Sequence, residues 1–136
     1  MNKKLVKQVK RSFKEQFKTK PLIVFSPGRI NLIGEHTDYN DGFAFPAAIN
    51  KGIAVAISKS DAKTSNVCAL NKNEIYNFNT ENIRPLKDGG WRNYMLGVVA
   101  ELQILRKQVG NFNAVFAGNI PGGAGMSSSA ALENGF

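Results

Sequence analysis

Cysteine is almost absent from this sequence: its 136 residues include one, Cys68, so no disulfide can form within the chain. Such sparse usage is typical of a reducing compartment. Long apolar runs are missing too, because stretches such as 43–49 and 53–57 fall far short of the roughly 18–20 residues that a membrane-spanning helix needs. No apolar segment of a secretory signal follows the N-terminal lysines. We therefore expect a cytoplasmic protein with no membrane partner, and Cys68 as a small core residue.

Acidic residues are scarce in the first 20 residues, which hold eight lysines and arginines but one acid, Glu15. The remainder is close to neutral, so the net charge of +8 describes this segment rather than the molecule. Leu5, Val9 and Phe13 recur there at helical spacing. We predict an amphipathic helix over residues 2–17 with a solvated cationic face, and no nucleic-acid partner. A short Lys-rich helix that binds nucleic acid, or that serves in transit, is the alternative.

The apolar pattern of the remaining chain predicts an α+β fold in one domain. Five short runs favour strands, and polar loops separate most of them. Apolar residues at helical spacing predict a second helix over residues 91–106, whose apolar stripe comprises Tyr94, Met95, Val98, Val99, Leu102 and Leu105. The expected strands are 22–25, 53–58, 67–70, 75–78 and 113–118, with turns at 26–28 and 40–42 and a further apolar stretch at 30–33.

A last helix is expected from Ser127, with room for barely two turns before Phe136. Helices this short are marginal unless they pack against other elements. We therefore interpret the sequence as a fragment that is cut within an element.

A glycine-rich segment, Gly123-Ala124-Gly125-Met126, leads into Ser127-Ser128-Ser129 and the last helix. Backbone N–H groups converge at such a turn, and the start of a helix adds unpaired donors, so the segment suits a polyphosphate. It is not a P-loop, because the Lys-Ser/Thr pair is missing, nor a dinucleotide fingerprint, because Ser128 replaces the third glycine. A connection whose serines only cap the helix is the alternative.

A second polar segment spans residues 29–39 and holds Arg29, Glu35, Asp38, Tyr39 and the only histidine, His36. Carboxylates accept paired hydrogen bonds from adjacent hydroxyls, which is how proteins hold sugars. A metal bound by His-x-Asp has a thin ligand set here. A surface loop with incidental charges is the remaining alternative.

Two motifs resemble those of known kinases. Residues 27–40, PGRINLIGEHTDYN, resemble the galactokinase signature throughout, and residues 121–130, PGGAGMSSSA, resemble the phosphate loop of the wider GHMP kinase family. The resemblance implies the N-terminal domain of a GHMP-type kinase, a ribosomal protein S5 domain 2-like fold with a mixed sheet and helices on one side. Residues 1–136 would form this domain incompletely, with the C-terminal domain absent.

The galactokinase motif implies a sugar site. Glu35, His36, Thr37 and Asp38 match positions that bind sugar hydroxyls, and Asp38 would read the C3 and C4 hydroxyls. Arg29 matches a catalytic arginine near the anomeric hydroxyl, which steers the developing alkoxide and the transferred phosphoryl group.

The second motif implies an ATP site with Mg²⁺. Ser129 would be the Mg²⁺ ligand, and Trp91 and Tyr94 are similar to aromatic residues near the adenine. For Trp91, an ordinary core aromatic at a helix start is the alternative. The implied ATP-binding loop comprises Gly123, Ala124, Gly125, Met126, Ser127, Ser128 and Ser129.

The implied activity is phosphorylation of D-galactose by ATP at the C1 hydroxyl. In such kinases the catalytic aspartate lies in a later motif, so we expect the 136-residue chain alone to be inactive. A kinase for a related sugar, such as N-acetylgalactosamine or arabinose, is an alternative. A non-catalytic sensor that binds galactose and ATP is another.

Overall fold

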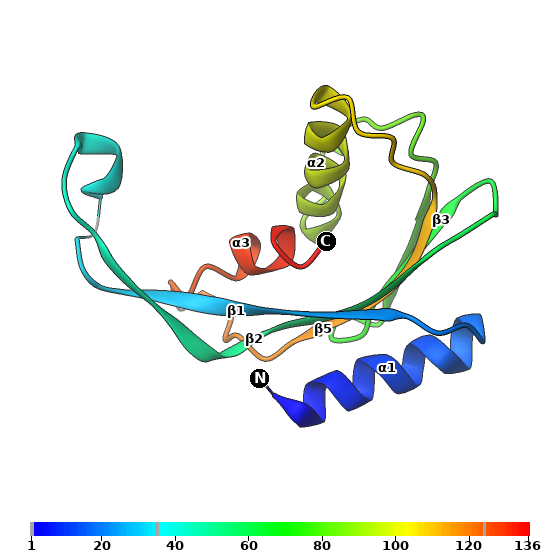
Figure 1. Ribbon diagram of the computed structural model, residues 1–136, viewed down its shortest axis with the longest axis horizontal. Helices are drawn as coiled ribbons and strands as arrows, with labels where there is room; N and C mark the ends of the chain where they lie inside the picture. Colours follow the sequence, from blue (N-terminus) through cyan, green and yellow to red (C-terminus); the bar gives the residue numbers. More distant parts are fainter. Residues whose placement is uncertain (1, 35, 124) are drawn as a thin grey trace.

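The computed structural model describes residues 2–34, 36–123 and 125–136, and its elements form one sheet with helices packed on it (Figure 1). The strand order is β1-β2-β5-β3-β4, and the sheet is mixed because β3 and β5 run parallel while the other pairs are antiparallel. The α+β class and the mixed sheet are therefore confirmed. The elements are α1 (Lys3–Phe17), β1 (Leu22–Ile33), a 3₁₀ turn (Asp38–Asn40), β2 (Phe45–Lys59), β3 (Ser65–Ala69), β4 (Glu74–Phe78), α2 (Trp91–Ile104), β5 (Phe112–Gly118) and α3 (Ser128–Glu133).

Helices cover both faces of the sheet, so the expectation of helices on one side is wrong. Figure 1 shows α1 on one face and α2 with α3 on the other. Because side chains alternate along a strand, Ala54 and Ala56 of β2 face α1, while Ile53 and Val55 belong to the opposite core. Each face of the central strands is thus apolar and needs its own cover.

The first helix forms where the sequence predicts it. The Asn2 side chain caps its start, with Oδ1 accepting from the Leu5 N–H at 3.1 Å. Leu5, Val9 and Phe13 are buried against β2, β3 and β5, and Cys68 is buried in the same cluster, as expected. The amphipathic pattern therefore fixes which side of α1 meets the sheet.

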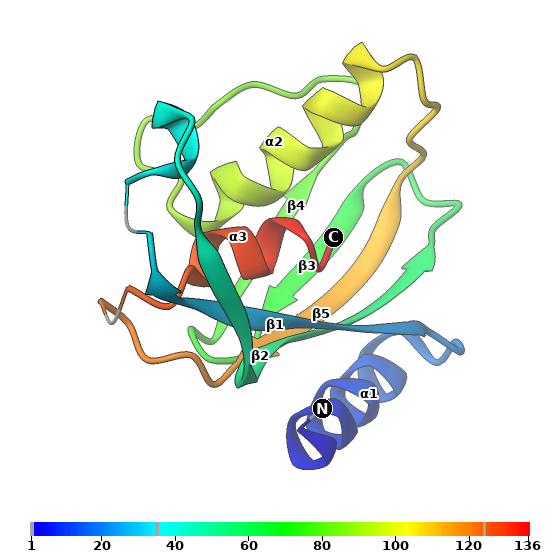
Figure 2. The same ribbon diagram turned by 60° about the vertical axis from the view of Figure 1, so that its left-hand side comes forward.

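The second helix only partly follows its predicted stripe. Met95 and Val99 are buried, but Tyr94, Leu102 and Leu105 are exposed. Residues four apart share one side of a helix, and the row through 91, 95 and 99 is the one that packs against the sheet. Figure 2 shows α3 beside α2, where it also contacts β1 and β2.

A turn at residues 26–28 was expected, but the structure shows one continuous strand, β1. Its ladder with β2 shifts register there, with Pro27 opposite Gly52 and Arg29 opposite Ala48. Because β1 is an edge strand, Pro27 can lack its N–H without breaking a central ladder. A register shift therefore replaces the predicted turn.

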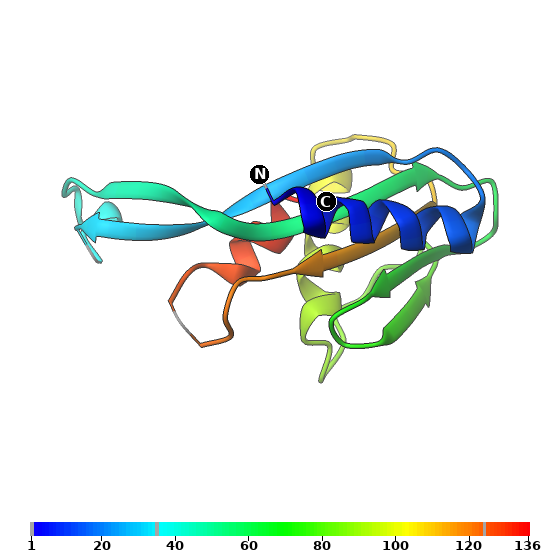
Figure 3. The same ribbon diagram turned by 90° about the horizontal axis from the view of Figure 1, so that it is seen from below.

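Beyond that shift, β1 and β2 continue away from the rest of the sheet as a two-stranded extension, which Figures 1 and 3 show from two sides. We call residues 29–49 the arm. The remaining part of the sheet, with its three helices, is called the body. No helix in the described ranges has the length and apolar character to cross a membrane.

Candidate functional site

The glycine-rich loop follows Asn119, a residue just after β5 that is held by two hydrogen bonds. Asn119 pairs with Gly52 twice: its N–H donates to Gly52 O at 3.1 Å, and its Oδ1 accepts from the Gly52 N–H at 2.8 Å. The loop then turns through positive φ at Gly123 (+70°) and Gly125 (+62°). A Cβ at either glycine would meet no atom within 4 Å, so the backbone here faces open space. Ala124, a predicted loop residue, lies outside the described residues.

The serines that follow do not simply cap the helix. Ser127 occupies the N-cap position of α3, yet its side chain makes no capping hydrogen bond. Its carbonyl instead accepts from the Ala131 N–H at 3.0 Å. Capping alone thus leaves the Ser127 hydroxyl unexplained.

A cavity of about 410 Å³ lies between α2, the start of α3 and the adjoining ends of the sheet. Four residues that the sequence assigns to one ATP site line it together: Trp91 and Tyr94 from α2, and Ser128 and Ser129 from α3. We call it the α2–α3 pocket. Its lining is mostly apolar, including Phe116 of β5, with hydroxyl groups at one end, a composition common in small-molecule sites.

Two polar residues that sequence reasoning did not assign to a site also line this pocket. Asn71 and Lys72 belong to the turn between β3 and β4. Asn71 Oδ1 accepts from the Gly118 N–H at 2.7 Å, which ties this turn to the end of β5. A polar turn between two short strands does not by itself indicate a binding site in the sequence. The role of Asn71 and Lys72 is visible only once the fold brings this turn to the end of β5.

The two predicted motifs meet at Gly28 and Arg29. The Arg29 N–H donates to Met126 O at 3.3 Å, so the strand that carries the arginine contacts the glycine-rich loop. A Cβ at Gly28 would lie 3.0 Å from Met126 O, 3.1 Å from Ile120 and 3.2 Å from Ile49. A glycine therefore allows the strand and the loop to approach this closely.

The polar loop at the tip of the arm is held by bonds within itself. The Thr37 hydroxyl lies 2.8 Å from Gly34 O and 2.9 Å from Phe43 O, and Asn40 Nδ2 donates to His36 O at 2.8 Å. His36 Nδ1 lies 2.6 Å from the Tyr39 hydroxyl. Sequence reasoning gave Tyr39 no role, although this contact orients the imidazole.

Glu35 lies outside the described residues, as does the side chain of Asp38, whose backbone begins the 3₁₀ turn. The loop itself lies at the outer end of the arm, away from α3, in both Figure 1 and Figure 3. The structure therefore joins the two motifs at Arg29 but leaves His36 and Thr37 apart from the serines. Among the described residues no group of three His, Cys, Asp or Glu is arranged to hold a metal ion.

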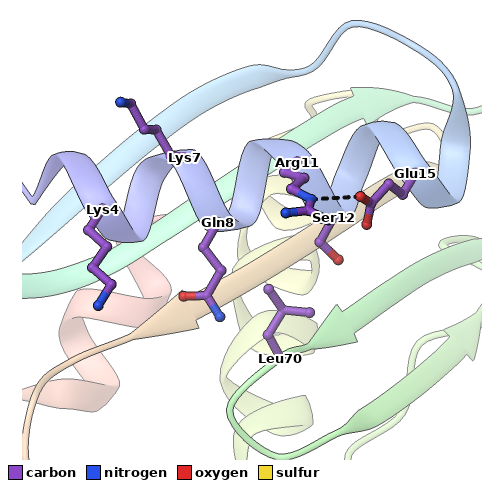
Figure 4. Close-up of a pocket in the computed structure, with 7 residues that line it drawn as sticks. All are labelled: Lys4, Lys7, Gln8, Arg11, Ser12, Glu15 and Leu70. Atoms are coloured by element: carbon purple, nitrogen blue, oxygen red, sulfur yellow. Dashed lines mark hydrogen bonds and ion pairs between the residues drawn. The ribbon is translucent and has the colours of Figure 1, made fainter.

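A separate groove of about 510 Å³ runs along the cationic face of α1 (Figure 4). Lys4 and Lys7 point in different directions there, and Arg11 is paired with Glu15 at 2.8 Å. The hydrogen bond and charge of Glu15 raise the pKa of Arg11. Since its cations do not converge and none of the predicted site residues lines it, we do not place the site in this groove.

Comparison with known proteins agrees with the motifs. Residues 11–59 match the galactose-binding signature of galactokinases. A galactokinase of Haemophilus influenzae is 42% identical over 133 residues, which cover 94% of this chain and 34% of the relative. One of Fusobacterium nucleatum is 42% identical over 128 residues, covering 90% of this chain and 33% of the relative. The resemblance to galactokinases is confirmed. The chain spans about a third of the length of these curated relatives.

Solved structures extend the galactokinase match to the fold. The crystal structure of Lactococcus lactis galactokinase complexed with galactose matches with a TM-score of 0.81 and 35% identity, covering 91% of this chain and 33% of that one. The Methanococcus jannaschii mevalonate kinase matches with a TM-score of 0.69 at 21% identity, covering 87% of this chain and 38% of that one. The GHMP-type fold is therefore confirmed.

Proposed function

We propose that this chain is part of an ATP-dependent galactokinase, which phosphorylates D-galactose at the C1 hydroxyl. The observation that carries the proposal is the junction of the two motifs, where the Arg29 N–H bonds to Met126 of the glycine-rich loop. A residue at this junction can reach between a sugar held on one side and a phosphate held on the other. The similarity to galactokinases over most of the chain supports the same activity.

In the proposed reaction the C1 oxygen of galactose attacks the γ-phosphorus of ATP. A P–O bond forms as the bond between the γ-phosphorus and the β–γ bridging oxygen breaks, and ADP leaves. Such transfers depend on positioning and on charge stabilisation. Arg29 would stabilise negative charge on the sugar oxygen and on the transferred group. The resemblance implies that the aspartate which takes the hydroxyl proton is not among these 136 residues, so we expect them alone to be inactive.

The open backbone at Gly123 and Gly125 and the hydroxyl groups of residues 127–129 fit a triphosphate with its Mg²⁺. Positive φ values turn the loop around open space at Gly123 and Gly125, and Ser128 and Ser129 border the α2–α3 pocket. Oxygen ligands suit Mg²⁺, which also keeps waters and phosphate oxygens as ligands, so one hydroxyl such as that of Ser129 is a sufficient protein contribution. Mg²⁺ would supply neutralisation of phosphate charge.

The adenine would occupy the apolar part of the α2–α3 pocket beside Trp91 and Tyr94. The sugar hydroxyls would be bound by the arm through Glu35, His36, Thr37 and Asp38. The imidazole of His36 is oriented by Tyr39 at 2.6 Å, which supports a defined hydrogen-bonding role for the ring. A single buried cysteine supports action in the cytoplasm.

The test is galactose-dependent ADP release by the full-length gene product with Mg²⁺ present. We expect ADP release with galactose, much less with glucose, and none after chelation of Mg²⁺. A protein that binds galactose and ATP yet releases no ADP would be a sensor instead. Faster release with N-acetylgalactosamine or arabinose than with galactose would correct the substrate.

A further inference from the structure

We propose that Glu74 is a positioning residue, which fixes the indole of Trp91 as a wall of the α2–α3 pocket and so sets nucleotide affinity. This inference rests on the proposed function of that pocket. Glu74 is the first residue of β4, and it lies 17 residues before Trp91 in the sequence. No motif or spacing links the two.

One oxygen of Glu74 holds two donors from the first turn of α2. Glu74 Oε2 accepts from Trp91 Nε1 at 2.8 Å and from Arg92 NH2 at 2.8 Å. An indole N–H that is taken out of water needs an acceptor, and a charged one bonds it more strongly than a neutral one. The side chain of Glu74 therefore defines where the N–H edge of the indole points.

The rest of the indole is packed by aromatic rings. Trp91 is 7% exposed, and its ring meets Phe116 at 5.0 Å and Tyr76 at 6.4 Å between centroids, both edge to face. The Arg92 guanidinium lies over the rings of Tyr76 and Trp91, at 5.7 Å and 5.4 Å. Glu74 thus balances the positive charge of Arg92, which lies over the indole face.

Within the described residues, α2 has no side-chain cap and no acidic residue of its own at its start. The N-cap position is Gly90, which has no side chain to cap the helix, and the first turn contains no acidic residue. A carboxylate beside a helix start is favourable, and Glu74 supplies it from the neighbouring strand. Loss of Glu74 would remove the fixed acceptor of the Trp91 N–H and leave that place, which is partly open to solvent, to water, so the indole would no longer be held in one orientation.

A shift of the indole would change the α2–α3 pocket and leave the arm untouched. Trp91 lines the pocket together with Tyr94 and Ser129, whereas the loop that joins β1 to β2 lies at the outer end of the arm (Figure 1). The inference therefore predicts a selective effect on the nucleotide. A purely structural role for Glu74 would instead weaken both substrates, or neither, through overall stability.

The experiment compares Glu74→Ala with Glu15→Gln in the full-length gene product. Glu15 also pairs with an arginine at 2.8 Å, but on the outer face of α1, so its variant is the control for loss of an ion pair. We expect Glu74→Ala to raise the KM for ATP and the Kd for ADP by about five- to tenfold, which is less than the loss of a charged hydrogen bond made directly to the nucleotide, because Glu74 acts through the indole. The galactose KM should stay within about twofold of wild type. Glu15→Gln should match wild type in all three.

A double-mutant cycle tests whether Glu74 acts through the indole N–H. Trp91→Phe keeps an aromatic ring and removes the donor, so Glu74→Ala should add little in that background. Additive effects of the two substitutions would overturn the inference. If Glu74→Ala does not fold, Glu74→Gln decides: it keeps one neutral acceptor, and we expect a smaller rise in the ADP Kd, about two- to threefold.

The outcomes separate the two proposals. Unchanged ATP and ADP constants in Glu74→Ala, with an active wild type, would overturn the role of Glu74 and leave the kinase proposal standing. A wild-type protein with neither ADP binding nor galactose-dependent ADP release would overturn both.

Discussion

The arm and the body of this molecule are stabilised by different interactions. In the body, Phe13, Val55 and Met95 are fully buried, and the sheet is covered on both faces. At the arm, Ile33 and Phe43 are exposed, and the loop between the strands is shaped by hydrogen bonds of Thr37 and Asn40. The proposed nucleotide groups therefore rest on a packed core, whereas the proposed sugar groups rest on a locally bonded turn.

This difference separates what each region contributes. Substitutions of buried core residues in the body should change stability first and binding second. Side-chain substitutions in the arm should change sugar binding with little effect on stability, whereas a substitution that strains its backbone should change both. The predictions below test that contrast, beginning with the largest expected effect.

The contrast between the body and the arm can be tested with the same substitution in each region, Phe13→Ala in the body and Phe43→Ala in the arm. Phe13 is 0% exposed and Phe43 is 98% exposed. We expect Phe13→Ala to lower the free energy of unfolding by about 3–5 kcal/mol. Phe43→Ala should change it by less than about 0.5 kcal/mol. Urea unfolding of the full-length protein measures both, and comparable losses would show that the arm is packed against other parts of that protein.

Asp38→Ala tests the sugar end by binding. Loss of a carboxylate that accepts from two sugar hydroxyls should raise the galactose KM by about 10–100-fold, with the ATP KM within about twofold. Asp41→Asn is the matched control, because Asp41 lies in the same loop with φ +55°, a conformation that asparagine tolerates. Equal rises in both KM values for Asp38→Ala would refute the assignment.

Gly34→Ala tests the backbone of the arm. Gly34 has φ +94°, and a Cβ there would lie 2.4 Å from Phe43 O. We therefore expect Gly34→Ala to lower the free energy of unfolding by about 1–3 kcal/mol and to impair galactose binding. Gly97→Ala is the opposite case, since Gly97 lies within α2 and its Cβ would meet open space. The free energy of unfolding of Gly97→Ala should rise by about 0.5–1 kcal/mol. Melting curves with and without galactose distinguish the two, and a neutral Gly34→Ala would contradict the tight approach of Gly34 to Phe43.

Local sequence patterns predicted the elements that are formed mainly by residues close together in the sequence. The lysine-rich helix was correct because Leu5, Val9 and Phe13 repeat at helical spacing and Asn2 caps it. The glycine-rich loop and the polar loop were recognisable because their turns are built from neighbouring residues. Helical spacing and turn-forming residues can both be recognised in the sequence before the fold is known.

Long-range packing decided the features that the sequence did not predict. Pro27 and Gly28 were expected to form a turn, yet an edge strand tolerates them. The predicted apolar stripe over residues 91–106 includes Leu102, which lies on α2 but is exposed, because the side of the helix that carries Met95 and Val99 is the one packed against the sheet. The Trp91 indole N–H donates to Glu74, 17 residues earlier in the sequence, and no sequence pattern predicts this contact.

Ser129→Ala has a smaller expected effect, confined to the metal. If the Ser129 hydroxyl is a Mg²⁺ ligand, its loss should weaken apparent Mg²⁺ affinity by about tenfold or more, since even outer-shell partners contribute 10–100-fold. Activity should partly recover as Mg²⁺ is raised. Ser12→Ala, on the outer face of α1, is the control and should leave the Mg²⁺ dependence unchanged. A Ser129→Ala defect that is insensitive to Mg²⁺ would exclude the ligand role.

The smallest effect is expected for Glu15→Gln, which sharpens the contrast between an outer surface and the pocket wall. The Arg11–Glu15 and Arg92–Glu74 pairs have the same length, 2.8 Å, but their side chains are 81% and 61% exposed in the first pair and 29% and 38% in the second. Water and salt screen the first pair, so its loss should leave the urea midpoint unchanged at about 0.15 M salt. Glu15 raises the pKa of Arg11, so any stabilisation is present at neutral pH and disappears only as pH rises through that pKa, far above neutrality. The Glu15→Gln midpoint should therefore follow wild type from pH 6 to 9, and a difference that grows within that range would show that the pair is coupled to another titrating group.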